Sequence, residues 1–517
     1  MSLNNAKPAQ LRPHIGKNST WREQTIDGTA KASLGLLLAG AIVTALLLGT
    51  ASRPIGTGYL AWTALLPMLF ALTSTRSLLL GSLVGWISWL GIGTTVFEGS
   101  LPVLPWAFPV LVAVSGFWWA AAGALFVWTR LWIGTFAALV TFPFVLVALE
   151  FISSQRLLFG DFANVLGALG YTQFDTPLKD LAALSSVSGI SLLVVGINVA
   201  IFMALRFRVF SGLPLVGVLI LVVILMPWKA TDAHSTSSST VAIVQGAFSK
   251  EEKEAARTDE QAAESLLQRY ASLSREAVDR GAQMVVWSET ILPEVVTDLT
   301  LSERTREALS TVPAAFVGAQ EFSGDSWFNS VFLWSEGMVS SAYRKQALVP
   351  IREAEYTAGG PNQNPVDMGE FSWSPLVCLD SVFPSLSRNA AMRGTNAIVY
   401  LTDDTFAGDT SAAYVHVRNT AFRAVETGRY AVFANESGPS AIFDERGEIQ
   451  AYVPRGVEGI AIATIPGLSA MTPYVLYGDW VGILSVAIIA SLALLATGRS
   501  VRGARRSGSA RPLHRPG

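Results

Sequence analysis

Long apolar stretches fill most of the first 230 residues of the chain and return once near its end. Each holds about twenty residues with few charges, the length that an α-helix needs to cross a bilayer core of about 30 Å. Membrane spans are predicted near residues 32–51, 57–74, 78–97, 104–129, 131–152, 182–205, 210–228 and 475–497. The pattern therefore predicts a membrane α-helical bundle of about eight transmembrane helices, with a long insertion before the last one.

The insertion has a different pattern. Short apolar runs alternate with polar stretches of helical periodicity, which is typical of a layered α/β domain. Strands are predicted at 240–245, 283–289, 314–320, 375–380, 397–402 and 430–435, and helices at 251–280 and 410–426. The run STSSST at 235–240 is typical of a linker that leads into this domain.

Basic residues near both ends of the chain predict its orientation in the membrane. Six arginines and no acid follow the last span, and five lysines or arginines precede the first, so both ends are expected in the cytoplasm. Seven spans before the insertion then place the insertion outside the cytoplasm. The predicted domains are a cytoplasmic tail (1–31), a seven-helix membrane domain (32–230), an extracytoplasmic domain (231–474), a final span (475–497) and a basic cytoplasmic tail (498–517).

The segment 153–181, between the fifth and sixth predicted spans, mixes apolar and aromatic residues with charges. It lacks an apolar stretch long enough to form a span of its own. This composition indicates an element that lies at the outer membrane surface. A loop that covers the helix ends is an equally good interpretation of the sequence.

Composition narrows the classes of function. The 517-residue chain has 51% hydrophobic and 15% charged residues and a formal net charge of −2, so it offers no basic surface for nucleic acid phosphates. The single cysteine, Cys378, excludes an intrachain disulfide and CxxC-type motifs, and four scattered histidines argue against a metal site. No glycine-rich nucleotide-binding motif is present, so neither a metal nor a cofactor is expected.

Three reactive side chains stand at or after predicted strands of the insertion. Glu289 closes VVWSE, Lys345 follows VSSAYR, and Cys378 lies in PLVCLD. A thiol nucleophile, with an ordinary pKa of about 8.5, needs a base to remove its proton and a cation to stabilise the thiolate or a later oxyanion. Taken singly, a cysteine in an apolar strand is most often a small buried hydrophobe, and a lysine or glutamate at a strand end is usually a surface group. No histidine is placed in sequence to form a Cys-His pair, although spacing alone does not exclude His416.

The order Glu, Lys, Cys, in VVWSETILPE, YRKQALVP and VCLDSVFP, resembles the nitrilase superfamily. With the multi-span frame, the sequence is similar to the apolipoprotein N-acyltransferase family of bacterial envelopes. The likeness continues in ALGYTQFDTPLKDLAALSSVSGIS at 168–191, VAIVQG at 241–246 and RAVETGRYAVFANESG at 423–438. The most specific motif is YRKQALVPIRE, in which family positions are occupied by Lys345, Leu348, Val349, Pro350 and Glu353.

The resemblance implies an extracytoplasmic αββα nitrilase-like sandwich domain and a Glu-Lys-Cys triad. Cys378 would be the nucleophile, Glu289 the general base and Lys345 the cation that helps bind the oxyanion. Glu353 would orient Lys345 or support the base; the alternative is a capping or surface acid. Asp380 stands at the position of a further family carboxylate and would support the site.

Apolar residues around Cys378 are candidates for substrate contact. Leu379 and Phe383 are the predicted substrate-binding residues, and Phe371 and Trp373 are further candidates for lining the active-site mouth. The alternative for these side chains is an ordinary place in the hydrophobic core.

The family implies transfer of an acyl chain from a phospholipid, through a cysteine thioester, to the α-amine of the diacylglyceryl-cysteine of lipoproteins. Such an enzyme would be a multi-pass protein of the bacterial inner membrane, and its partners would be both membrane-anchored substrates and membrane lipid.

The sequence departs from the family pattern at four places. It has Trp-Ser-Glu where Trp-Pro-Glu is usual, Leu379-Asp380 where Tyr-Glu is usual and Arg352 where glycine is common, and it has no tryptophan in 246–260. Two alternatives therefore remain: a membrane-tethered nitrilase-type amidase, and a weakly active paralogue that serves as a scaffold for a polyprenol-phosphate mannose synthase.

Overall fold

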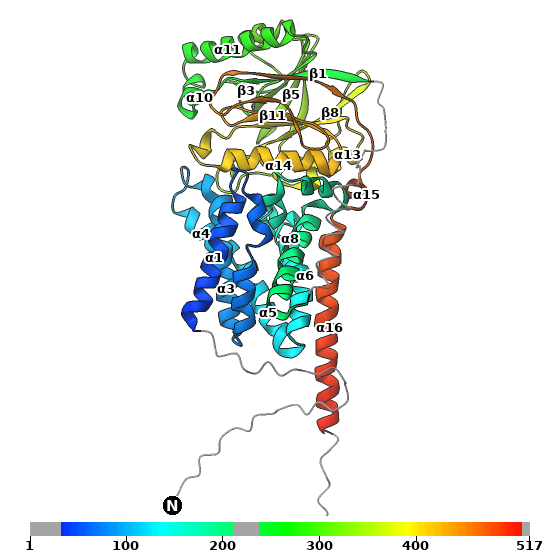
Figure 1. Cartoon of the computed structure of the whole chain (residues 1–517). Helices are drawn as coiled ribbons and strands as arrows, with labels where there is room; N and C mark the ends of the chain where they lie inside the picture. Colours follow the sequence, from blue (N-terminus) through cyan, green and yellow to red (C-terminus); the bar gives the residue numbers. More distant parts are fainter. Residues whose placement is uncertain (1–32, 210–236, 509–517) are drawn as a thin grey trace, which may run out of the picture.

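A computed structural model describes residues 33–209 and 237–508 of the chain. They form a helical body and a layered α/β domain stacked on one end of it (Figure 1). Both predicted tails, the seventh predicted span at 210–228 and the start of the linker at 235–240 lie wholly or partly outside the described residues.

Five helical segments of the described chain are long and apolar enough to cross a membrane. They contain α1 (Leu34–Ser52), α3 (Leu78–Phe97), the pair α4 (Ala107–Ser115) and α5 (Phe117–Trp132), α6 (Thr135–Ser153) and α8 (Ala182–Phe207). Each corresponds to one of the predicted spans. The bundle of apolar helices that the hydrophobic pattern predicts is thus present.

Two other predicted spans are interrupted. The second is a 3-10 turn, η1 (Gly58–Trp62), followed by α2 (Leu66–Ser74), and the last starts as the short α15 (Pro473–Tyr477) before α16 (Trp480–Gly508). Pro67 marks the start of α2, because proline fits the first turn of a helix but not its interior. Gly478 has a φ of +67°, which ends α15. The mean hydropathy of a stretch of about twenty residues does not reveal either break.

Glycines bring the helices of the bundle close together. A side chain at Gly91 of α3 would collide with the carbonyl oxygen of Ala45 in α1, and one at Gly85 with that of Trp119 in α5. The backbone of α3 therefore packs directly against both neighbours, the small-residue packing that apolar helices use in membranes.

The α/β domain contains two sheets. Strand order is β13-β1-β2-β4-β5-β6 in the first, with β3 beside β4, and β12-β11-β10-β9-β8-β7 in the second. The strands are β1 (Ser238–Gln245), β2 (Met284–Val286), β3 (Val295–Val296), β4 (Ala314–Ser323), β5 (Ser326–Ser335), β6 (Met338–Arg344), β7 (Val366–Met368), β8 (Phe371–Val377), β9 (Ala397–Thr402), β10 (Tyr430–Asn435), β11 (Ser440–Phe443), β12 (Ile449–Val453) and β13 (Gly459–Pro466). Strands β1, β2 and β4 run parallel, as do β8, β9 and β10.

Side-chain alternation along the strands produces four layers. Val241 and Ile243 of β1 enter the core between the sheets, whereas Ala242 packs beneath α11 (Glu260–Asp279). The second sheet is covered on its outer face by α14 (Ala412–Thr427), whose side chains pack in one apolar cluster with the strands of that sheet. Further helices are α10 (Lys250–Ala256), α12 (Glu303–Leu309) and α13 (Pro384–Met392). The αββα nitrilase-like sandwich implied by the resemblance is confirmed.

Three predicted elements of this domain differ from the pattern. The strand predicted at 283–289 ends at Val286, so Glu289 lies three residues beyond the end of β2. The helix predicted at 251–280 is divided into α10 and α11, because the side chain of Asp259 accepts a hydrogen bond from the Ala262 N–H and caps a new helix. The strand predicted at 375–380 ends at Val377, and Cys378 begins a 3-10 turn, η6 (Cys378–Val382).

The α14 layer faces the helical body, and α11 lies on the opposite side of the domain (Figure 1). Phe422 of α14 packs in one apolar cluster with Ile190 of α8. Arg418 of α14 forms a 2.7 Å ion pair with Asp175 of the helical body. The layer that meets the apolar helices is therefore the one that covers the second sheet.

Candidate active site

The structure brings Glu289, Lys345 and Cys378 together at one end of the sandwich. Each follows a strand: Glu289 follows β2, Lys345 follows β6 and Cys378 follows β8. All three line one pocket of about 300 Å³, together with Glu353. The three side chains that sequence reasoning selected thus share a cavity although they lie far apart along the chain.

Cys378 occupies an unusual backbone conformation. Its φ is +45°, in the left-handed region that costs a non-glycine residue about 1–2 kcal/mol. The turn is held on one side by Asp380, whose carboxylate accepts a hydrogen bond from the Val377 N–H at 3.0 Å. A strained turn between a strand and a helical element presents the thiol at the strand end, where it meets the pocket.

The ammonium group of Lys345 lies between two carboxylates. Its Nζ donates to Oε1 of Glu289 and to Oε1 of Glu353, both at 2.9 Å, and all three side chains are buried. Asn329 of β5 donates its Nδ2 to the same two oxygens at 2.7 and 3.0 Å. The N–H of Asp403 donates to Oε2 of Glu289 at 3.0 Å. Glu353 therefore contacts Lys345 directly and is not a surface acid.

Asn329 and Asp403 were not among the residues selected from the sequence. Asn329 is a buried polar residue in the run WFNSVFLW, which is otherwise apolar and aromatic except for Ser330, and that mismatch is the signal that could have identified it. Asp403 acts through its backbone N–H, and its carboxylate forms a 2.6 Å ion pair with Lys253. A backbone donor leaves no signal in the sequence.

These charges determine which groups carry protons at rest. Burial raises the pKa of the Cys378 thiol well above its ordinary value, Glu289 raises it further, and Lys345 lowers it. Burial lowers the pKa of Lys345, but Glu289, Cys378 and Glu353 outweigh this effect and raise it well above its ordinary value. Burial raises the pKa of Glu353, but Lys345 and the Val349 N–H hold it below its ordinary value. At neutral pH the site therefore holds a neutral thiol and a charged ammonium.

The raised pKa of the thiol gives a prediction with a definite sign. Because the Glu289 carboxylate raises the pKa of Cys378, Glu289→Gln is expected to lower it and to leave more thiolate at pH 8. Because the thiolate is the form that reacts, iodoacetamide should alkylate this variant faster than wild type. Lys345→Met is expected to slow alkylation. The matched control is Glu355→Gln, because Glu355 is an exposed acid of the same pocket. An alkylation rate of Glu289→Gln at or below that of wild type would show that the Glu289 carboxylate does not raise the pKa of the thiol.

Asp380 is completely buried and joins the two loops that carry Lys345 and Cys378. Its Oδ1 accepts from the N–H groups of Gln346 and Ala347 at 3.2 and 2.7 Å, and its Oδ2 accepts from the hydroxyl of Tyr343 at 2.9 Å. Burial raises the pKa of Asp380 to about 6, against the lowering effect of these donors. The carboxylate supports the site from behind and does not line the pocket.

Asp380→Asn tests this supporting role. An amide in this place turns an N–H₂ group toward buried donors, which is expected to destabilise the fold by about 3 kcal/mol. Thermal unfolding of the purified chain in detergent should show a midpoint lower by about 5–10 °C. The control is Asp409→Asn, at a fully exposed carboxylate. Equal unfolding midpoints for the two variants would show that the hydrogen bonds of Asp380 do not stabilise the domain.

His416 forms a second network, behind the cysteine. Its Nδ1 lies 3.1 Å from Oδ1 of Asp404, and its Nε2 lies 2.8 Å from Oγ of Ser381 and 3.2 Å from the carbonyl oxygen of Cys378. Burial lowers the pKa of His416, but Asp404 outweighs burial and raises it above its ordinary value. No hydrogen bond in the described part of the chain joins this imidazole to the thiol, so His416 holds the turn and does not form a Cys-His pair.

The predicted substrate-binding residues do not line the pocket. Phe383 is almost fully buried and packs with Val165 and Ala347, and Leu379 lies at the edge of the same cluster. Phe371 and Trp373 belong to the core between the sheets, as the alternative interpretation held. The pocket wall is instead mostly polar and charged, with Lys250, Lys253, Glu254, Arg257, Thr290, Gln320, Arg352, Glu355, Tyr356 and Asp403 among its residues.

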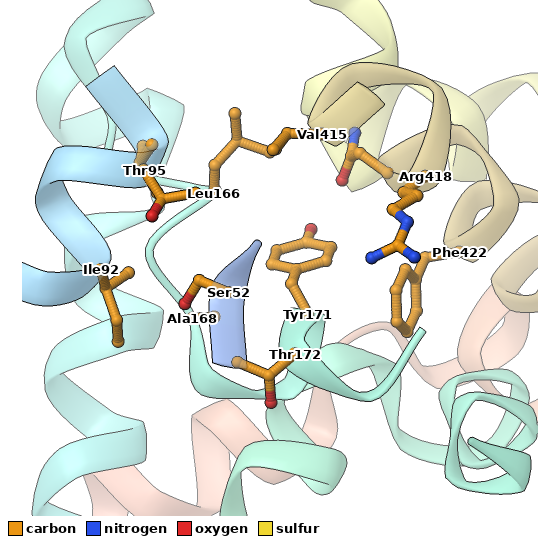
Figure 2. Close-up of a pocket in the computed structure, with 12 residues that line it drawn as sticks. Ser52, Ile92, Thr95, Leu166, Ala168, Tyr171, Thr172, Val415, Arg418 and Phe422 are labelled. Carbon is orange, nitrogen blue, oxygen red and sulfur yellow. The ribbon is translucent and has the colours of Figure 1, made fainter. Parts of the chain in front are cut away.

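A second, smaller cavity lies between α14 and the helical body (Figure 2). It measures about 40 Å³, and Tyr171 and Leu166 face Val415, Arg418 and Phe422 of α14 across it. That volume holds a water molecule but not an acyl chain. No cluster of metal-ligating side chains occurs within residues 33–209 and 237–508.

The sandwich and its Glu-Lys-Cys pocket, carried on apolar helices, define a membrane-bound protein of the carbon-nitrogen hydrolase class. Residues 240–474 match the carbon-nitrogen hydrolase family, and residues 44–200 match the apolipoprotein N-acyltransferase N-terminal domain. The chain belongs to the apolipoprotein N-acyltransferase family.

Full-length relatives agree with the two domain matches. The apolipoprotein N-acyltransferase of Geobacter metallireducens is 28% identical over 499 residues, covering 88% of this chain and 94% of that protein. The apolipoprotein N-acyltransferase of Photobacterium profundum is 25% identical over 475 residues, covering 83% and 87%. Among solved structures, Nit3 of Saccharomyces cerevisiae, a nitrilase superfamily member, aligns with 45% of this chain and 91% of its own at 20% identity and a TM-score of 0.38.

Proposed function

We propose that this protein N-acylates lipoproteins: it moves an acyl chain from a membrane phospholipid to the α-amine of a diacylglyceryl-cysteine, through a thioester on Cys378. The observation that carries this proposal is the Lys345 ammonium, held at 2.9 Å from the Glu289 carboxylate in the pocket that also contains the thiol. The family of the chain supports the same reaction, because both of its domains match.

In the first half-reaction, Glu289 removes the proton of the Cys378 thiol as sulfur attacks the ester carbonyl of the phospholipid. Negative charge develops on the carbonyl oxygen, and the Lys345 ammonium stabilises it. The carbon–oxygen ester bond then breaks. Glu289 returns its proton to the departing oxygen, which leaves as the hydroxyl of a lysophospholipid, and the acyl group remains on sulfur as a thioester.

In the second half-reaction, the α-amine of the lipoprotein attacks the thioester carbonyl, and Glu289 takes a proton from the attacking nitrogen. Lys345 again stabilises the oxyanion. The carbon–sulfur bond breaks, an amide forms, and the proton on Glu289 passes to the sulfur of Cys378. Glu289 thus serves as base and then acid in each half, and the thiol is regenerated.

Glu353 and Asn329 are proposed to position these groups. Glu353 accepts a hydrogen bond from Lys345, and Asn329 donates to both Glu289 and Glu353. These contacts fix the base and the cation before substrate arrives. The carboxylate of Glu353 also balances the charge of the buried ammonium when Glu289 is protonated during the reaction.

We also propose that the α/β domain lies outside the cytoplasm of a bacterial cell, with both ends of the chain inside and eight spans in the inner membrane. The supporting observation is the run of arginines without acids after the last span, because short segments rich in lysine and arginine are generally retained on the cytoplasmic side. Both substrates are anchored in a bilayer, and a site stacked on the helical body meets them by lateral diffusion. The match of residues 44–200 to an N-acyltransferase domain favours acyl transfer over a tethered amidase or a scaffold.

The test is transfer by the purified full-length chain in vesicles that contain a phospholipid with a labelled acyl chain. A synthetic diacylglyceryl-cysteine peptide serves as the acceptor, and the same peptide with an acetylated amine is the control. The label should appear on the free-amine peptide alone. Release of labelled fatty acid with equal rates in the presence and absence of acceptor would instead identify a hydrolase.

A further inference from the structure

The short segment 156–162 follows α6 and has apolar side chains that nothing in the described protein covers. It consists of α7 (Arg156–Phe159) and a 3-10 turn, η3 (Gly160–Phe162). Leu157 is 96% exposed, Leu158 61% and Phe162 68%. Three large apolar side chains on seven residues form a surface that is costly to leave in water.

A ring contact shows how deep this segment lies. Phe159 packs edge-on against Trp118 of α5, with ring centroids 5.5 Å apart. Trp118 lies near the middle of the apolar segment Ala107–Trp132, which is long enough to cross a bilayer. Nearby, the aromatic ring of Trp89, midway along α3, lies against Gly167. The segment therefore dips alongside the helices to a level where they meet lipid.

The polar side chains of the same segment point the other way, into the catalytic domain. Arg156 donates to the carbonyl oxygen of Gln346, and Asp161 accepts from the N–H of Leu348 at 3.2 Å. The two side chains are joined to each other by a 2.6 Å ion pair. They therefore hold residues 346–348, the loop that directly follows Lys345.

We infer that residues 156–162 insert Leu157, Leu158 and Phe162 among the acyl chains of the adjacent lipid leaflet and, through Arg156 and Asp161, fix the loop after Lys345 relative to the bilayer. The partner of this surface is bilayer lipid, because the surface continues the lipid-facing side of the spans at the level of Trp118. Lipid contact thereby supports the geometry of the Lys345 site. The second part of this inference rests on the proposed function; the insertion itself does not.

Insertion can be measured without activity, because Cys378 is the only cysteine of the chain. Cys378→Ser gives a cysteine-free protein, into which Leu157→Cys or Phe162→Cys places a single spin label in the full-length chain in phosphatidylglycerol–phosphatidylcholine vesicles. Ser265→Cys, on the exposed face of α11 far from the helical body, is the matched control (Figure 1). Labels at 157 and 162 should collide with apolar oxygen more than with a water-soluble nickel chelate, and the label at 265 should show the reverse. Equal chelate access at 157, 162 and 265 would identify 156–162 as a water-exposed covering loop and overturn the inference.

The coupling to the site is tested in the cysteine-containing chain. The double variant Arg156→Ala, Asp161→Ala removes both contacts to the 346–348 loop and should slow acyl transfer in vesicles about tenfold, the effect of losing charge-assisted hydrogen bonds. Arg446→Ala is the control, because Arg446 makes an ion pair with Asp180 between the same two bodies but away from this loop. If the double variant transfers acyl chains at the same rate as Arg446→Ala, the segment inserts into lipid but does not affect the geometry of the Lys345 site. An inactive wild type with inserted labels would refute the proposed function and leave the insertion standing.

Discussion

Cys378→Ala is expected to abolish acyl transfer, with a rate at least about 10⁴-fold below wild type, because it removes the thiol on which the proposed thioester forms. The thiol is the only one in the chain, and it lines the same pocket as the Glu289 carboxylate and the Lys345 ammonium. The measurement is N-acylation of a diacylglyceryl-cysteine peptide in vesicles. The fold should persist, since the variant removes one sulfur atom from a small side chain.

Cys378→Ser provides the matched comparison for that variant. The serine hydroxyl fits the same turn, but a carboxylate is too weak a base to activate an alcohol, so this variant should also fail. Thermal midpoints within a few degrees of wild type would show that both variants are folded. Full N-acylation by either variant would remove the covalent mechanism and favour the scaffold interpretation.

Lys345→Met is expected to lower the rate of transfer by about 10²–10³, the usual cost of losing a group that stabilises an oxyanion. Methionine retains most of the length of the side chain but not its charge. The carboxylates of Glu289 and Glu353 would then face each other without the cation between them, so one of them would hold a proton and the base would be impaired as well. Both half-reactions should slow, because both pass through an oxyanion.

Arg344→Met is the control for Lys345→Met. Arg344 is the preceding residue, is also paired with a carboxylate, that of Glu321, and is not among the residues that line the pocket. Its loss should leave transfer within about threefold of wild type, the scale of a partly exposed ion pair. Should Lys345→Met retain activity within twofold of wild type, Lys345 would be a structural cation and the oxyanion site would have to be sought elsewhere.

Much of the architecture could be predicted from the sequence because it follows from local patterns. Apolar runs of about twenty residues identified the helices of the bundle, and short apolar runs identified six of the thirteen strands that the described residues form: β1, β2, β4, β8, β9 and β10. The other seven strands were not predicted. Breaks inside these elements were harder to predict. The span near 57–74 is divided and the strand near 375–380 stops at Val377, because turns and caps, and not average apolarity, set these ends.

Site residues that stand in recognisable motifs could be predicted from the sequence. Site residues whose side-chain orientation depends on the register of a strand could not. Glu289, Lys345 and Cys378 stand in recognisable motifs, and the structure places them in one pocket. Asn329 enters the same network only because of its place in β5, where a shift of one residue would turn its side chain to the other face. Phe383 was a reasonable lining residue by its distance from Cys378 in sequence, but the turn after the cysteine directs it into the core.

Whether Cys378 carries the acyl chain can be measured by intact-mass spectrometry of the full-length chain. The protein is incubated in vesicles of a phospholipid with one defined acyl chain and no acceptor, and is then exposed to the diacylglyceryl-cysteine peptide. We expect a mass increase of one acyl group on Cys378 that is lost when peptide is added, with the same group appearing on the peptide amine. Acylated peptide formed without any adduct on Cys378, before or during turnover, would contradict this expectation.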